Sequence, residues 1–141
     1  EISLGLVGSE MCIRDSSISP DNCLKPIEGT VVYILEVPED KVMYFDDVKW
    51  DYVLNRIYLP DDEEDEKAYK QHLKDIGVSN GFEFFQGRYK GMYPEEEARI
   101  RESWKRAFRI DKWTIFNVCG NIWEIRQEWV KRIVKPGEAV K

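Results

Sequence analysis

Blocks of apolar and polar residues along the chain predict strands toward both ends and helices between them. Residues 30–37, T-V-V-Y-I-L-E-V, are rich in β-branched side chains and nearly continuous in apolar character, which predicts a central strand covered on both faces. Toward the C-terminus, residues 113–118, 121–126 and 129–134 are predicted as three further strands, the first two separated at residues 119–120 by a turn or joined there by a bulge in one long strand. We expect these strands to form a mixed or mainly antiparallel sheet.

The stretch 45–60, F-D-D-V-K-W-D-Y-V-L-N-R-I-Y-L-P, predicts an amphipathic helix. Asp46 or Asp47 is expected to cap its start, because a short carboxylate accepts hydrogen bonds from the otherwise unpaired first-turn N–H groups. Pro60 then forces the chain out of the helix. Four apolar residues recur at the i, i+3, i+4, i+7 spacing that lines one helix face, namely Trp50, Val53, Leu54 and Ile57.

Two more helices are predicted between residues 61 and 109. The first begins with six acids at 61–66 and continues with lysines, an order that matches the helix dipole, and Gly77 is expected to end it. The second starts at Pro94 and runs to Arg109, with Trp104 among the apolar residues of one face. Two to three helices packed on the sheet give the predicted fold class, a single α+β domain.

The N-terminal residues set the predicted domain limits. Residues 1–16, E-I-S-L-G-L-V-G-S-E-M-C-I-R-D-S, resemble a translated sequencing adapter, which would make them non-native. The alternative is a flexible arm with one short strand at 4–7. We expect residues 17–135 to form the domain and residues 136–141 to be a tail, and we assign no function to the first segment.

Composition and charge exclude several functional classes. The 141 residues carry a formal net charge of -6, which opposes nonspecific attraction to nucleic acid or to an anionic membrane. No apolar run approaches the ~20 residues of a membrane helix. The three cysteines include no C-x-x-C pair, so neither a disulfide framework nor a zinc knuckle is indicated. A reducing, cytoplasmic location fits this pattern.

Few residues offer catalytic chemistry. His72 is the single histidine, and we interpret it as an exposed bystander on a surface helix, because no nucleophile motif accompanies it. Cys119 lies in a predicted apolar strand, where a small thiol usually packs. The acidic run 61–66 lacks the interleaved glycine and alternating ligands of a calcium loop. We therefore expect no metal, no cofactor and no clear catalytic set.

Charge is unevenly distributed along the chain. Residues 36–66 hold twelve acids and three bases, whereas residues 88–141 hold thirteen bases and eight acids. We expect the two segments largely to neutralise each other, and the alternative is a face that binds a charged partner. The residues predicted to bind such a partner combine basic and aromatic side chains: Trp50, Tyr58, Arg99, Arg101, Lys105, Arg106, Trp123 and Arg126.

Several motifs together resemble an uncharacterised family of small bacterial and phage proteins, a domain of unknown function. They are V-x-x-L-E-V-P-E-D-K-V, the 45–60 stretch, E-S-W-K-R-A-F and N-I-W-E-I-R-Q-E-W-V. The resemblance covers residues 30–135 and implies no established activity. The family pattern usually has histidine where this chain has Asp51, and a strand and a helix precede the first motif. The resemblance therefore implies a member truncated at its N-terminus.

Three functional hypotheses remain. The first is a noncatalytic binding or inhibitory protein of bacterial or phage origin, an anti-defence protein that engages a host protein or a nucleotide-like anionic ligand. The second is an enzyme that resembles ADP-ribosyltransferases, with Glu124 on the 121–126 strand as the weak candidate catalytic acid. The third is an acidic mimic of nucleic acid that uses residues 61–66. The missing catalytic set favours the first.

Overall fold

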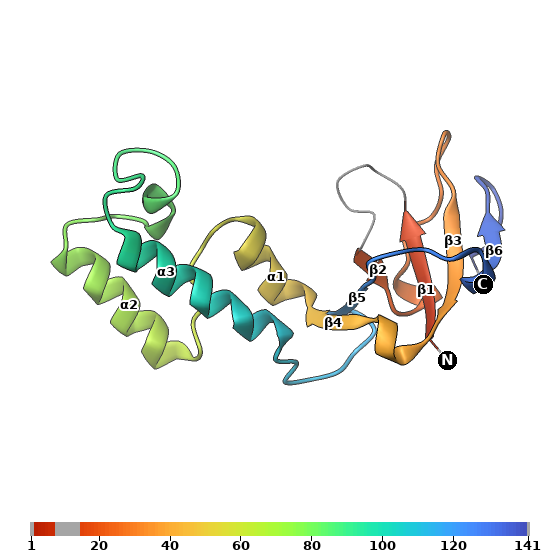
Figure 1. Ribbon diagram of the computed structural model, residues 1–141, viewed down its shortest axis with the longest axis horizontal. Coiled ribbons are helices and arrows are strands. Elements are labelled where there is room, and N and C mark those ends of the chain that lie inside the picture. Colours follow the sequence, from red (N-terminus) through yellow and green to blue (C-terminus); the bar gives the residue numbers. More distant parts are fainter. Residues whose placement is uncertain (1, 8–14, 141) are drawn as a thin grey trace. The chain divides into compact units, whose positions relative to one another are not determined.

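The computed structural model describes residues 2–7 and 15–140, with side chains from residue 16 onward (Figure 1). It divides the chain into two compact units. The residues before 46 and after 109 form the sheet unit, and residues 46–109 form the helical unit. The predicted α+β class is confirmed, because six strands and three α-helices are present among the described residues.

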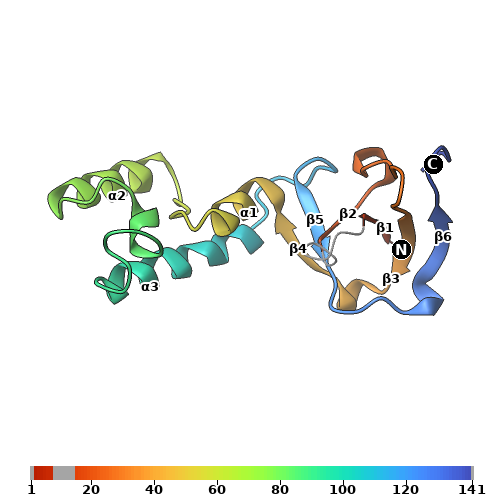
Figure 2. The same ribbon diagram turned by 90° about the horizontal axis from the view of Figure 1, so that it is seen from above.

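The sheet has the strand order β4-β5-β2-β1-β3-β6, and its strands can be followed in Figure 2. The pairings of β1 with β2 and β3, of β2 with β5 and of β3 with β6 are all antiparallel. The predicted central strand is confirmed as β3, which lies between β1 and β6. The strands span Ile2–Val7, Asp15–Ser17, Val32–Val37, Met43–Asp46, Val118–Asn121 and Val130–Val134.

The sheet unit has its own apolar core. Leu35 and Val37 of β3 pack with Ile122 and Trp129, and all four are buried. Strand β6, Val130–Val134, confirms the predicted strand at 129–134 and pairs with β3 through one register shift. Burial of these apolar side chains is the main source of stability for the sheet unit.

Two predicted strands are wrong. Residues 113–117 form a turn, because Asn117 binds the backbone N–H of Thr114 at 3.0 Å and its amide donates to the Lys112 carbonyl at 2.8 Å. Such side-chain bonds offer the backbone an alternative to a sheet ladder. The predicted strand at 121–126 is not formed, because the observed strand β5 ends at Asn121. Its partner β2 has three residues, which pair with residues 119–121 of β5.

The helical unit contains α1, Asp47–Leu54, α2, Glu63–Asp75, and α3, Pro94–Ser103. A 3-10 turn, Trp104–Phe108, continues α3. Leu73 of α2 and Ile100 of α3 pack around Phe84 and Phe85 in a buried apolar core. Against α1, the Trp50 ring meets Phe108 edge-to-face at 6.1 Å.

The predicted residues at the end of α2 and at the start of α1 are confirmed, but the predicted apolar face of α1 is not. Gly77 ends α2 with φ +73°, as predicted, and Asp62, within the acidic run expected at the helix start, caps it. Asp46 caps α1, with its carboxylate 3.1 Å from the Lys49 N–H, also as predicted. The predicted apolar face of α1 is wrong, because the helix stops at Leu54, and Leu54 and Ile57 are 64% and 42% exposed.

The prediction for residues 1–16 stays a prediction. Residue 1 and residues 8–14 lie outside the described residues. Residues 2–7 form β1, which pairs along its whole length with β3 and includes the short strand expected at 4–7. No helix in the described part of the chain is long and apolar enough to cross a membrane.

Candidate functional site

Half of the residues predicted to bind a ligand line one cavity of the helical unit. This cavity of about 460 Å³ is called the Arg106 cavity, and Tyr58, Arg99, Lys105 and Arg106 are on its wall together with Glu102, Ser103 and Arg109. Arg101 lines a different cavity. The structure thus brings Tyr58 next to three of the predicted cations and separates Arg101 from them.

The cations of the Arg106 cavity are mostly paired within the protein. Arg106 lies 3.6 Å from Asp65 and 4.0 Å from Asp61, and it donates to the Leu59 carbonyl at 2.5 Å. Arg109 forms an ion pair with Asp61 at 2.6 Å. These pairs join the end of the α3 region to the start of α2, and they fit the predicted neutralisation of acidic and basic segments.

Asp65 is the centre of this network. Its carboxylate accepts from the Asp61 backbone N–H at 2.8 Å and from the Tyr58 hydroxyl at 2.9 Å. The Asp61 N–H bond is the main cause that lowers the pKa of Asp65, and Tyr58 and Arg106 lower it further. Burial raises the pKa of Tyr58. An ionised Asp65 therefore holds Tyr58 and Arg106 in place.

Tyr58 is enclosed on both ring faces. The Arg106 guanidinium carbon lies 5.7 Å from its centroid, and the Tyr69 ring stacks at 4.0 Å with an interplanar angle of 20°. The Tyr58, Asp61, Asp65 and Arg106 contacts therefore have a structural explanation, since they lock the segment after α1 onto α2 and α3. Binding of a ligand by Tyr58, Arg99, Lys105 and Arg106 stays a prediction.

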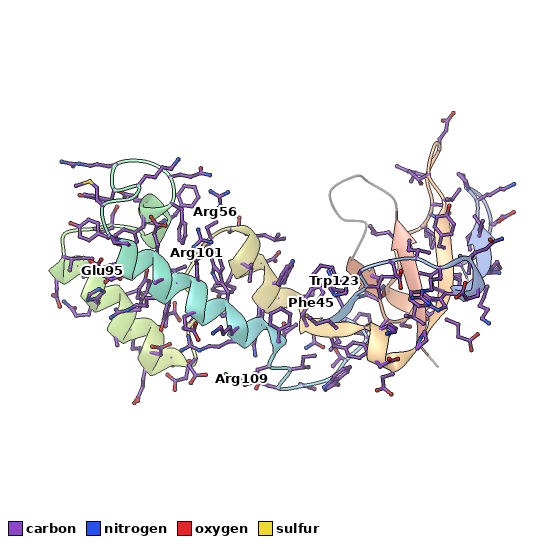
Figure 3. All side chains as sticks on the ribbon, viewed as in Figure 1. Phe45, Arg56, Glu95, Arg101, Arg109 and Trp123 are labelled. Carbon is purple, nitrogen blue, oxygen red and sulfur yellow. The ribbon has the colours of Figure 1, made fainter. Side chains whose placement is uncertain are left out.

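The second cavity, called the Arg101 cavity, has a volume of about 570 Å³. It lies between the end of α1, the loop before α3 and α3 itself, and Figure 3 labels Arg56 and Arg101 of its wall. Three cations and one carboxylate line it. The lining residues are Val53, Arg56, Phe85, Lys90, Gly91, Glu97, Arg101 and Trp104.

Arg101 lies over two aromatic rings. Its guanidinium carbon is 5.0 Å from the Phe85 centroid and 5.7 Å from the Trp104 centroid. The two rings are stacked, with centroids 5.7 Å apart and an interplanar angle of 25°. The Trp104 indole is itself fixed, because its N–H donates to the Ile57 carbonyl at 2.8 Å. Cation–π contacts of this kind hold a guanidinium without neutralising its charge.

Arg56 adopts a left-handed backbone conformation with φ +56°, and it is the only non-glycine residue with positive φ among the described residues. It follows the α1 C-cap, Asn55, and the N–H of Ile57 donates to the Tyr52 carbonyl at 2.9 Å. This is a Schellman end, in which glycine is the usual residue at the left-handed position. Gly77 occupies the same position after α2.

The three cations of the Arg101 cavity are not neutralised by the fold. Within the part of the chain that the structure describes, Arg56, Lys90 and Arg101 form no ion pair. Glu97, the one carboxylate on the wall, accepts from the Gly91 N–H at 3.3 Å instead. The Arg101 cavity therefore has a net positive wall that is available to an anion.

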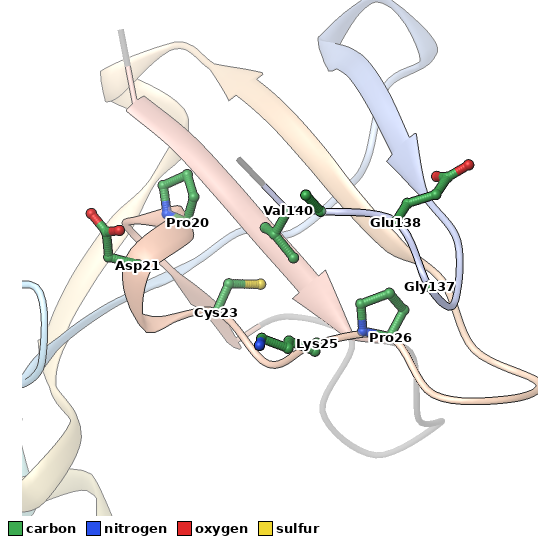
Figure 4. A pocket seen from close by; sticks show the side chains of 9 residues that line it. Pro20, Asp21, Cys23, Lys25, Pro26, Gly137, Glu138 and Val140 are labelled. Carbon is green, nitrogen blue, oxygen red and sulfur yellow. The ribbon is translucent and has the colours of Figure 1, made fainter.

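Other cavities offer less chemistry. One of about 220 Å³ beside Tyr58 is lined by Tyr69, whose pKa burial and the Glu96 carboxylate raise to about 12. A cavity of about 580 Å³ in the sheet unit has loop and C-terminal residues on its wall (Figure 4). It contains Cys23, and burial raises the pKa of that thiol, which disfavours the reactive thiolate.

The remaining predicted residues are on the wall of neither basic cavity. Trp50 is part of α1 and packs on Phe108. Trp123 belongs to the sheet unit and is 71% exposed. Arg126 lies 5.4 Å from the Trp129 ring centroid and forms an ion pair with Glu124 at 2.6 Å. Glu124 is therefore an exposed, paired carboxylate outside any strand, which corrects the strand placement expected for it.

His72 corrects a second expectation. Its Nε2 lies 2.7 Å from a carboxylate oxygen of Glu96, and the Glu96 side chain is 8% exposed. The histidine is therefore not a bystander, because it joins α2 to α3 through a buried carboxylate. No side chain with a nucleophilic atom is bonded to it in the described part of the chain.

Sequence analysis missed Arg56, Phe85 and Lys90 as site residues. Arg56 gives no recognisable signal, because a helix end is normally marked by glycine and not by arginine. Phe85 is an apolar residue that gives no sign of a binding role, and Lys90 lies in a loop whose path depends on tertiary packing. Arg101 was predicted to bind, but its aromatic partners come from separate parts of the chain.

The fold and the site define a small α+β protein with a basic, aromatic cavity and no assembled catalytic set among the described residues. The chain belongs to the family described as Domain of unknown function (DUF3841), whose sequence model matches residues 13–131. The whole helical unit and the whole Arg101 cavity fall within this match, whereas strand β1 and most of β6 lie outside it. No curated protein and no solved structure matches the chain.

Proposed function

We propose that this chain is a noncatalytic binding protein that engages an anionic ligand through the Arg101 cavity. One observation carries the proposal: Arg56, Lys90 and Arg101 line a single cavity and form no ion pair within the described residues. Exposed cations are normally dispersed or solvated, whereas three unneutralised cations around one concave wall attract a multivalent anion.

The biological setting extends this proposal. The resemblance to small bacterial and phage proteins supports an inhibitory, anti-defence role in the cytoplasm of a bacterial cell. In that role the protein would sequester a ligand or engage a host protein that carries an anionic group. Neither activity needs a catalytic set.

The two alternative functions have weaker support. An acidic mimic needs free carboxylates, but Asp61 pairs with Arg109, Asp65 accepts from Tyr58, and Glu66 pairs with Lys70 at 2.5 Å. An ADP-ribosyltransferase-like enzyme needs Glu124 in a substrate pocket, and Glu124 pairs with Arg126 on the surface instead.

Titration calorimetry with inorganic tripolyphosphate tests the proposal. We expect binding that weakens from low to physiological ionic strength, because the contacts are screened within about 8–10 Å. Arg101→Glu is expected to weaken binding by about tenfold or more, the worth of one charge-assisted hydrogen bond. Lys67→Glu is the matched control, since it reverses an exposed charge of α2 that lines neither basic cavity and should leave affinity nearly unchanged.

Two results would contradict the proposed function. One is the absence of salt-sensitive tripolyphosphate binding by the wild-type protein. The other is an equal loss of affinity in Arg101→Glu and Lys67→Glu, which would assign the attraction to general surface charge and not to the Arg101 cavity.

A further inference from the structure

The Arg101 side chain presents a planar surface as well as a charge. Its guanidinium carbon lies 5.0 Å from the Phe85 centroid and 5.7 Å from the Trp104 centroid, so the group is held beside this aromatic pair. The side chain is exposed, so part of the guanidinium is accessible to a ligand. Nucleic-acid bases stack on guanidinium planes and on aromatic rings, and such stacking needs no particular base sequence.

The wall around Arg101 carries two kinds of polar group. Arg56 and Lys90 suit phosphate oxygens, the first through its rigid fork of donors and the second as a point charge. Glu97 repels phosphate, and its second carboxylate oxygen makes no hydrogen bond among the described residues. That oxygen suits a hydroxyl or amino donor of a ligand. The cavity is therefore matched to a molecule with both an anionic and a hydrogen-bond-donating part.

Arg56 adds an argument from backbone strain. A non-glycine residue in the left-handed region is strained, and such outliers concentrate at functional sites. The chain uses glycine for the same helix end after α2, where no cavity is described at that position. At α1 it has an arginine whose side chain lines the Arg101 cavity. Arg56 is therefore less favourable for the backbone than glycine would be, but it places a cation on the wall of the Arg101 cavity.

We infer that the ligand of the Arg101 cavity is a nucleoside polyphosphate. Its base stacks against the Arg101 guanidinium beside Trp104, its phosphates contact Arg56 and Lys90, and Glu97 accepts from the ribose or the base. The volume of about 570 Å³ is in the range of small-molecule and cofactor sites. This inference rests on the proposed function and narrows the anion to one chemical class.

Arg101→Lys separates attraction of the phosphates from stacking of the base, because it keeps the positive charge and removes the planar guanidinium. We would titrate the full chain and this variant with tripolyphosphate and with ATP, GTP, CTP and UTP. The wild-type protein is expected to bind at least one nucleoside triphosphate about tenfold more tightly than tripolyphosphate, the contribution of one stacked base. In Arg101→Lys, tripolyphosphate affinity should change by less than about threefold, and the preference for the nucleoside should disappear.

Lys90→Ala is the second variant, and it should weaken tripolyphosphate and the nucleotide by the same factor, because it removes only a phosphate contact. Circular dichroism checks that each variant is folded. If tripolyphosphate binds and no nucleotide binds more tightly, the inference is wrong while the proposed function stands. If neither ligand binds, both are wrong. A nucleoside preference that persists in Arg101→Lys would overturn the stacking assignment.

Discussion

At Arg56, an unfavourable backbone conformation coincides with a position on the wall of a basic cavity. The Schellman bonds of this helix end are formed by backbone groups alone, so they need no particular side chain. Glycine would satisfy the left-handed φ with no steric penalty. The arginine is therefore explained by its side chain and not by the helix end.

Exchanging residues at the two Schellman ends tests this explanation. Arg56→Gly should raise the free energy of unfolding by about 0.5–1 kcal/mol, and Gly77→Ala should lower it by about 1 kcal/mol. The Gly77 result isolates the backbone penalty, because an added Cβ there meets no atom within 4 Å. Urea unfolding monitored by circular dichroism measures both changes.

Arg56→Ala is the matched control for the side chain. It keeps the left-handed penalty and removes the guanidinium, so we expect almost unchanged stability but the same loss of tripolyphosphate affinity as in Arg56→Gly. If Arg56→Gly were destabilising, the side chain would be holding the fold, and the argument from strain would be wrong.

At the scale of elements, the sequence predicts a helix end correctly where a single residue caps or terminates the helix. The sequence predicts the end of α2 at Gly77 and the start of α1 at Asp46 or Asp47, because left-handed termination and capping are properties of single residues. The end of α1 could not be predicted, since Arg56 replaces the usual glycine. The turn at Thr114 could not be predicted either, because its aromatic and β-branched residues favour a strand, and the Asn117 side-chain bonds decide otherwise.

The candidate site was predictable only in part, because its residues are brought together by contacts between distant parts of the chain. A basic face on residues 99–109 follows from helical spacing. The division of that face into two cavities depends on tertiary partners: Asp61 and Asp65 neutralise one side, whereas Phe85 and Trp104 support Arg101 on the other. Partners that are distant in sequence leave no periodic signal.

Ser103 connects two of these elements. Its buried hydroxyl accepts from the Leu59 N–H at 2.9 Å and donates to the Ile100 carbonyl at 2.6 Å. Ser103→Ala would leave the buried Leu59 N–H without its partner, so we expect a loss of about 1–3 kcal/mol in unfolding free energy. Ser79→Ala is the control, because Ser79 bonds Glu83 at an exposed site and should change stability by less than about 0.5 kcal/mol. Equal effects in chemical denaturation would contradict this role for Ser103.

At the scale of the whole molecule, the sheet unit and the helical unit each have an apolar core of their own. The core of Leu35, Val37, Ile122 and Trp129 belongs to the sheet unit, and the core around Phe84 and Ile100 belongs to the helical unit. Every residue on the wall of the Arg101 cavity comes from the helical unit, which is one continuous segment of chain. The Arg101 cavity therefore depends on the packing of the helical unit.

Deletion of residues 1–7 tests whether the Arg101 cavity is independent of the sheet unit. It also tests whether the N-terminal segment is part of the native fold. Strand β1 pairs with all six residues of β3, Val32–Val37, so its removal would leave those backbone groups without their partner strand. We expect thermal unfolding of the sheet unit at a lower temperature, with helical circular dichroism and tripolyphosphate affinity retained. An unchanged melting temperature would show that the segment is foreign to the native fold, as its resemblance to an adapter sequence predicts. Loss of tripolyphosphate binding on deletion would instead contradict the assignment of the site to the helical unit alone.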